Sequence, residues 1–182
     1  MRKTNQIETR EQIIRRRRNQ ALERREWLSL LVRVLLLVLT GWVLFSQMFL
    51  ITQATGKDMF PAVKDGDLII GFRLHKEYVK DDIVVYRADG KQRVGRIVAR
   101  EKDVVTLDES GNLQVNGTTQ DGEIMFPTYQ KEGLEYPFQV PEGEVFLLGD
   151  YRTQSTESRD FGPVPVKELE GKVITILRRR GL

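Results

Sequence analysis

The longest apolar stretch of the chain begins at Val34 and ends at Ile51, and its eighteen residues carry no charge. Residues 28–32 extend it on the other side of a lone Arg33. A helix needs roughly 20 apolar residues to cross about 30 Å of hydrocarbon, so the pattern predicts a transmembrane helix over residues 27–52. Arg33 lies near one end of this segment, where its long stem can carry the guanidinium to the lipid headgroups.

A cleaved signal peptide is the alternative interpretation of the same segment. Its apolar run is longer than the usual signal-peptide core of about 7–15 residues, which favours a retained anchor. Thr52-Gln53-Ala54 nevertheless has the small-x-small pattern of a cleavage site. The size of the protein on a gel distinguishes the two interpretations.

After residue 52 the pattern changes to short runs rich in Val and Ile that are separated by turn residues. Asn116-Gly117 is a strong hairpin signal, and no long run with helical periodicity occurs in this region. The pattern therefore predicts a mainly β domain of antiparallel hairpins over residues 53–182, with a long loop or small insertion over 117–141. The expected strands cover residues 68–72, 83–86, 94–99, 104–107, 113–115, 145–148 and 173–177.

Charge is distributed unevenly along the chain, although the formal net charge is only +3. Residues 1–33 hold 10 Lys and Arg against 4 Asp and Glu, whereas the remaining residues hold 19 against 22. Basic clusters such as residues 15–18 stay on the cytoplasmic side of a membrane. We therefore expect a basic cytoplasmic tail over 1–26 that contacts anionic membrane lipid, and a β domain outside the cytoplasm. The slightly acidic folded part argues against nucleic-acid binding.

The chain has no cysteine and a single histidine, His75. Without thiols there is no disulfide framework, no thiol nucleophile and no thiolate-held zinc or iron–sulfur site. One histidine excludes a multi-histidine metal centre and leaves little room for a serine–histidine triad. The sequence therefore predicts neither a metal site nor a cofactor.

Four short segments resemble, in residue type, order and spacing, the conserved boxes of bacterial type I signal peptidases (peptidase family S26). Each match is weak alone, but the four in order are specific. They are residues 56–61 (GKDMFP) followed by Gly66-Asp67, residues 82–87 (DIVVYR), residues 93–99 (RVGRIVA) followed by residues 103–105 (DVV), and residues 149–152 (GDYR) followed by Ser155, Glu157-Ser158-Arg159 and Gly162.

This resemblance implies an activity and a layout. The family removes signal peptides from secreted proteins at the outer face of the membrane. Its members have a basic tail, an N-terminal span and a mainly β catalytic domain. The resemblance therefore implies a signal-peptidase-like antiparallel β-sheet domain that follows a single N-terminal transmembrane helix.

The two catalytic positions depart from the family pattern. In the family, a buried lysine whose pKa is lowered removes the proton of a serine hydroxyl, which attacks the scissile carbonyl. Aligned with the patterns G-x-S-M-x-P and F-V-K-R-V-I-G, this chain has Asp58 at the serine position and Gly95 at the lysine position. Moving Lys91 to the lysine position would break the match from Arg96 onward. Lys57 is the neighbour of Asp58, and on an extended strand it would face the opposite side.

Other positions of the family pattern are kept. Ser155 matches the serine that hydrogen-bonds the catalytic lysine, and Glu157 with Arg159 matches an Asp–Arg pair. Gly56 matches a position on the strand edge where the substrate backbone pairs in β fashion. The predicted peptide-binding or vestigial site comprises Gly56, Lys57, Asp58, Met59, Pro61, Gly95, Arg96, Ser155, Glu157 and Arg159.

The resemblance leads to a catalytically inactive signal peptidase-like protein that acts as a chaperone or adaptor for exported proteins. Members of this kind occur in the pilus gene clusters of Gram-positive bacteria and are required for pilus assembly, so pilin precursors and a sortase are the implied partners. One alternative is an active endopeptidase with an Asp58-based site, which needs a second carboxylate that shares a proton. Another is a purely structural membrane-anchored β module without a groove beside Asp58.

Overall fold

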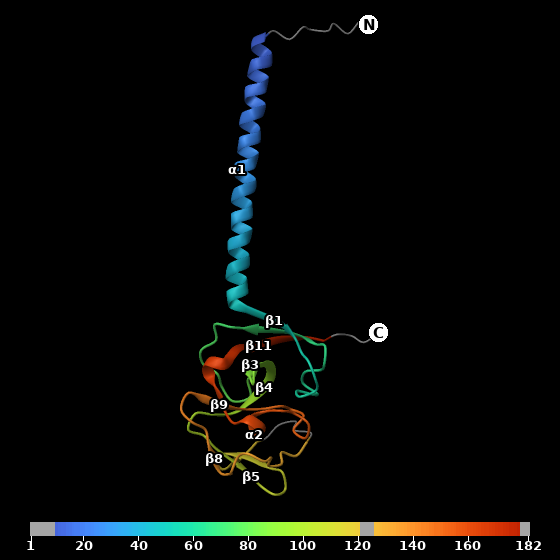
Figure 1. The fold of residues 1–182 in the computed structure, drawn as a ribbon, viewed down its shortest axis with the longest axis vertical. Coiled ribbons are helices and arrows are strands. Elements are labelled where there is room, and N and C mark those ends of the chain that lie inside the picture. The colour runs from blue at the N-terminus through green and yellow to red at the C-terminus, as the bar shows by residue number, and fades with distance from the viewer. Residues whose placement is uncertain (1–9, 121–125, 179–182) are drawn as a thin grey trace. The chain divides into compact units, whose positions relative to one another are not determined.

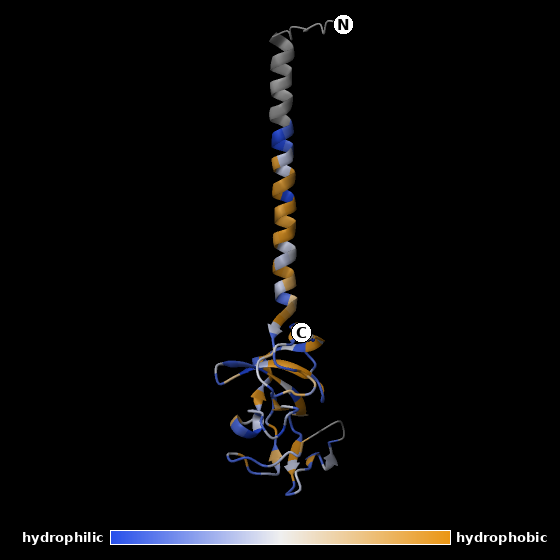
Figure 2. Ribbon diagram, turned by 90° about the vertical axis from the view of Figure 1, so that its right-hand side faces the viewer, coloured by the Kyte–Doolittle hydropathy of each residue, from blue (hydrophilic) through white to orange (hydrophobic). Residues whose placement is uncertain are grey.

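The computed structural model describes residues 10–120 and 126–178, with side chains from residue 23 onward. It divides into a helical unit that ends at Ser46 and a β unit that begins at Gln47. The helix α1 covers Arg10–Met48, and its part from Glu23 to Met48 is the one helix in the described residues long and apolar enough to cross a membrane. Figure 2 shows much of this segment in orange, after a blue, hydrophilic start.

The predicted span over residues 27–52 is wrong at its C-terminal end, because the helix stops at Met48 and Phe49–Gln53 forms strand β1. Along β1 the side chains alternate, with Leu50 buried and Ile51 about half exposed. A continuous apolar run carries no signal that separates the end of a helix from the start of a strand. Cleavage after Ala54 would remove β1 from its partner β2, which favours the retained anchor.

The β unit contains two antiparallel sheets, as the alternating pattern predicts, and Figure 1 shows their strands. The larger has the order β1, β2 (Leu68–Phe72), β11 (Leu169–Leu177), β3 (Ile83–Ala88), β4 (Lys91–Arg100), β9 (Glu144–Leu148) and β10 (Val164–Pro165). The smaller has the order β7 (Thr118–Thr119), β6 (Leu113–Val115), β5 (Val104–Leu107) and β8 (Phe138–Gln139). Two short helical segments follow β9, namely α2 (Ser158–Phe161) and a 3-10 turn (Val166–Glu168).

All seven expected runs are strands. The segment 117–141, expected to be a loop or a small insertion, also contributes β7 and β8, which lie on the two edges of the smaller sheet. Residues 121–125 of that segment lie outside the described residues.

The hairpin between β3 and β4 sets the register on which the site depends. Asp89 and Gly90 form its turn with φ values of 50° and 71°, the left-handed conformation that two-residue hairpin turns favour. In this register Gly95 pairs with Val84, and Arg93 pairs with Tyr86. Arg93 and Gly95 are two residues apart on one strand, so both point to the face that carries Tyr86.

Candidate peptide-binding site

Asp58 lies in the loop that joins β1 to β2, and core packing holds this loop in place. Met59 and Val63 are 3% and 2% exposed and belong to the apolar cluster beneath β1 and β2. On the other side, the carbonyl oxygen of Asp58 accepts the backbone N–H of Tyr151 at 2.9 Å. The position at which the family pattern has its serine is therefore fixed from two directions.

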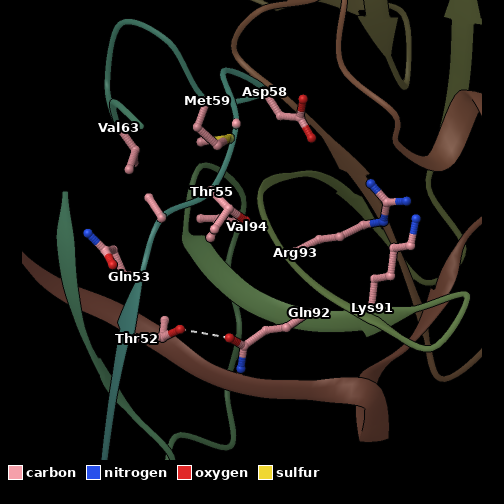
Figure 3. A pocket seen from close by; sticks show the side chains of 12 residues that line it. Thr52, Gln53, Thr55, Asp58, Met59, Val63, Lys91, Gln92, Arg93 and Val94 are labelled. Carbon is pink, nitrogen blue, oxygen red and sulfur yellow. Dashed lines mark hydrogen bonds between the residues drawn. The ribbon is translucent and has the colours of Figure 1, made fainter. Parts of the chain in front are cut away.

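A hollow of about 430 Å³ opens beside Asp58, between this loop and the first residues of β4. Figure 3 shows Asp58, Arg93 and Lys91 toward one side of it and Thr52 toward the other, where Thr52 Oγ1 donates to Gln92 Oε1 at 2.7 Å. The hollow is lined by residues 52–56 together with Asp58, Met59, Val63, Lys91, Gln92, Arg93 and Val94.

The carboxylate of Asp58 is half-buried beside this hollow. It makes no hydrogen bond or ion pair with the residues that the structure describes, and burial raises its pKa above the ordinary aspartate value. The charges of Arg93 and Lys131 oppose this rise, and that of Asp160 adds to it. Asp160 acts only through its charge and is engaged elsewhere, since its Oδ2 accepts Lys131 Nζ at 2.7 Å and the Glu157 N–H at 2.8 Å. Among the described residues, therefore, no second carboxyl group forms the shared-proton pair that an Asp58-based mechanism needs.

No side chain extends from position 95, and the space around it is occupied. A Cβ atom at Gly95 would lie 3.0 Å from Tyr86 Cε1, closer than ordinary packing allows, and Tyr86 is 2% exposed. Lys131 is the lysine whose charge lowers the pKa of Asp58. Its Nζ donates to the Ser155 carbonyl oxygen at 2.6 Å and pairs with Asp160. The Lys131 ammonium is therefore already engaged by two oxygen acceptors.

Ser155 belongs to a buried network instead of facing an amine. Its Oγ donates to Glu157 Oε2 at 2.6 Å. Glu157 Oε2 also accepts the Gly149 N–H. Glu157 Oε1 pairs with Arg159, and these three side chains are 1% to 2% exposed. The network touches the Asp58 loop directly, because a Cβ atom at Gly149 would lie 2.4 Å from the Asp58 carbonyl oxygen.

Three predicted residues, Lys57, Pro61 and Arg96, do not line the hollow beside Asp58. Arg96 forms a two-pronged pair with Asp150, at 2.8 and 2.7 Å, and so ties β4 to the turn after β9. Lys57 is exposed and lines a different hollow together with Phe60. This agrees with the expectation that the neighbour of Asp58 faces another side. Pro61 lines neither hollow.

The expectation that Gly56 lies on a strand edge is wrong. Strand β1 ends at Gln53, and Gly56 turns the chain with φ +86°, a conformation that favours glycine. Its N–H donates to Asp65 Oδ1 at 2.9 Å, so this donor is not free to pair with a bound backbone. Gly56 contributes to the wall of the hollow instead.

Sequence reasoning did not identify the cations beside Asp58. Arg93 stacks over the Phe161 ring at 5.8 Å, and its buried Nε finds no acceptor in the described part of the chain. Arg93 could have been identified from the sequence, because it lies two residues before Gly95 on one strand and so faces the same side. For Lys131 no such signal exists, because a loop brings it to Ser155 from 24 positions away.

Comparison with known proteins gives one consistent family. The signal peptidase, peptidase S26 family profile matches residues 24–177. Signal peptidase I of Bacillus caldolyticus is 31% identical over 134 residues, which cover 65% of this chain and 73% of that protein. Signal peptidase IB of Staphylococcus aureus strain Mu50 is 29% identical over 172 residues, which cover 81% and 86%.

Two other matches are more partial. A probable thylakoidal processing peptidase 2 of Arabidopsis thaliana is 33% identical over 132 residues, 64% of this chain, and the match spans 34% of that longer protein. A crystal structure of a signal peptidase I from Enterococcus faecalis V583 overlaps with a TM-score of 0.47 and 27% identity, over 55% of this chain and 98% of that one. Because the family profile covers most of its length, the chain belongs to the signal peptidase, peptidase S26 family.

Proposed function

We propose that this protein is a catalytically inactive member of the family that binds exported polypeptides at the outer face of the membrane, as a chaperone or adaptor. The observation that carries the proposal is the joint presence of Asp58 and Gly95 where the family pattern has its serine and lysine, inside a fold that is otherwise kept. The relatives are named as peptidases, so the loss of activity is argued from these two positions of this chain.

The chemistry of an isolated carboxylate supports inactivity. A carboxylate is a weak nucleophile toward an amide, and its attack would give an anhydride that reverts more readily than it goes forward. Removing members of a nucleophile–base unit costs on the order of 10³-fold or more in rate. Among the described residues, Ser155 does not form a hydroxyl–amine pair beside Asp58, since its Oγ donates to Glu157 and Lys131 pairs with Asp160.

The hollow supports a binding role. It has polar ends and an apolar stretch that includes Met59, Val63 and Val94, and it lies along β1, an edge strand of the larger sheet. An extended chain can pair with such an edge and place alternate side chains in adjacent pockets. The apolar segment of α1 would tether the β unit to a membrane, on the outer side if the basic tail stays inside.

Pilus assembly is the process that we assign to this binding role. The assignment rests on the resemblance, through the replaced serine and lysine positions, to the signal peptidase-like members of Gram-positive pilus gene clusters. The expected clients are pilin precursors during pilin polymerisation, with a sortase as the enzyme that joins them. The alternative, an endopeptidase that uses Asp58, draws support from the raised pKa of this residue but requires a partner carboxyl to approach it.

A binding assay tests the proposal. The full chain in detergent is titrated into a fluorescein-labelled peptide that spans an Ala-x-Ala signal-peptide cleavage region, and fluorescence anisotropy is measured. Thr55→Trp fills the hollow from an exposed position and should weaken binding at least about tenfold, or 1.4 kcal/mol. The matched control Thr118→Trp, exposed on β7, should bind like the wild type. Absence of saturable binding, or equal binding by both variants, would overturn the proposal.

A further inference from the structure

A second hollow, of about 400 Å³, adjoins Asp58 from the other side of its loop. It shares no lining residue with the first hollow. Three of its six lining residues are aromatic, and the centre of the Tyr151 ring lies 4.5 Å from that of Phe126 and 6.3 Å from that of Phe60. Phe60 is 37% exposed, so part of its ring is available to a bound group. The lining residues are Lys57, Phe60, Lys64, Asp65, Phe126 and Tyr151.

The Asp58 loop contributes residues to both hollows. Asp58 and Met59 line the first hollow, whereas Lys57 and Phe60 line the second. The wall of the second hollow is tied to the same point, because the Tyr151 N–H donates to the Asp58 carbonyl oxygen at 2.9 Å. An extended peptide advances about 3.3 Å per residue and alternates its side chains. A chain bound along the first hollow therefore reaches the second within a few residues of the one that faces Asp58.

Positive charge surrounds both hollows, although the chain after residue 33 is slightly acidic, with 22 acidic and 19 basic residues. The second hollow carries Lys57 and Lys64 against Asp65, whose Oδ1 already accepts the Gly56 N–H. The first carries two more basic side chains, at positions 91 and 93, against Asp58. This local reversal of charge favours acidic groups on the bound chain.

We propose that the second hollow is a specificity subsite that takes one bulky apolar side chain, preferably aromatic, flanked by acidic residues of the exported polypeptide. Aromatic rings favour offset or tilted contacts with other rings, which Phe60, Phe126 and Tyr151 offer here. This inference rests on the proposed peptide-binding function and deepens it by naming the side-chain chemistry that the client presents beyond Asp58.

The test uses the full chain in detergent and three fluorescein-labelled, alanine-rich peptides of equal length that carry Asp-Phe-Asp, Asp-Ala-Asp or Lys-Phe-Lys at the centre. The wild type should bind the Asp-Phe-Asp peptide at least about tenfold more tightly than either of the others. Phe60→Ala should erase the preference for the Asp-Phe-Asp peptide over the Asp-Ala-Asp peptide. The matched control Tyr129→Ala removes an exposed aromatic ring outside both hollows and should keep the preference.

The double variant Lys57→Glu, Lys64→Glu tests the charge. It should bind the Lys-Phe-Lys peptide more tightly than the Asp-Phe-Asp peptide, which reverses the wild-type order. Equal binding of phenylalanine and alanine peptides by the wild type, an unchanged preference in Phe60→Ala, or no reversal in the lysine double variant overturns the subsite and leaves the first hollow intact. Failure of all three peptides to bind overturns the proposed function together with the subsite.

Discussion

Replacing Glu157 by alanine removes the acceptor of three donors at once. Its Oε2 accepts Ser155 Oγ at 2.6 Å and the Gly149 N–H, and its Oε1 pairs with Arg159, which is 2% exposed. Taking away one partner of a buried ion pair costs about 3–5 kcal/mol, because the other charge stays buried without compensation. Each buried donor left unsatisfied adds about 1–3 kcal/mol, although such costs are not additive.

Arg159 keeps two backbone acceptors, the carbonyls of Arg152 and Tyr129, which limit its loss. We therefore expect Glu157→Ala to lower the free energy of unfolding by at least about 4 kcal/mol, a large part of the roughly 5–15 kcal/mol typical of a domain. The matched control is Glu142→Ala. Its pair with Lys102 is 3.5 Å long, the two side chains are 78% and 68% exposed, and its loss should cost less than about 1 kcal/mol.

Urea unfolding of the full chain, followed by the near-UV circular dichroism of its tyrosines, measures both changes. Tryptophan fluorescence is unsuitable because Trp27 and Trp42 both lie in α1 and do not report on the β unit. A cost for Glu157→Ala below about 1 kcal/mol, similar to that of Glu142→Ala, would refute the view that a buried ion pair holds this site together.

Two further predictions concern Asp58 and the glycines around it. Burial raises the pKa of Asp58, so ionising it destabilises the folded state. Asp58→Asn should be more stable than the wild type at pH 7. This gain in the free energy of unfolding should vanish as the pH falls through the folded-state pKa of Asp58 to below about 3.9. A variant that is less stable than the wild type at pH 7 would contradict the prediction. Among alanine substitutions, Gly149 should cost most, about 3 kcal/mol, because its Cβ would lie 2.4 Å from a backbone oxygen. Substitution of Gly95, whose Cβ would lie 3.0 Å from a side-chain carbon of Tyr86, should cost less, and that of Gly71, at 3.4 Å, least. The urea midpoints give the order of the three variants, and any other order refutes the prediction.

Much of the fold follows from the sequence because the β unit repeats one strong signal. Short Val- and Ile-rich runs between turn residues predict strands, and the hairpin turn at Asn116-Gly117 predicts an antiparallel pair, which is observed between β6 and β7. Strand β1 escaped prediction because it continues an apolar helix without a break. The two-residue strands β7 and β8 contain too few positions to show any alternation.

The site, like the fold, was predictable from the sequence only in part. The order of the four segments predicted that Asp58, Gly95 and Ser155 belong to one place, and the packing of Gly149 against both Asp58 and Ser155 explains part of that proximity. The surroundings of Asp58 were not predictable, because they depend on the paths of loops. Lys131 reaches the site by such a path, and the second hollow forms where Tyr151 meets the Asp58 loop.

The most direct measurement is a search for products after prolonged incubation. The purified full chain in detergent is mixed with a peptide that spans a signal-peptide cleavage site, and mass spectrometry follows the peptide over a range of pH. The account predicts that the peptide stays intact with the wild type, and that any turnover arises only in the double variant Asp58→Ser, Gly95→Lys. Cleavage by the wild type that disappears in Asp58→Ala would contradict it.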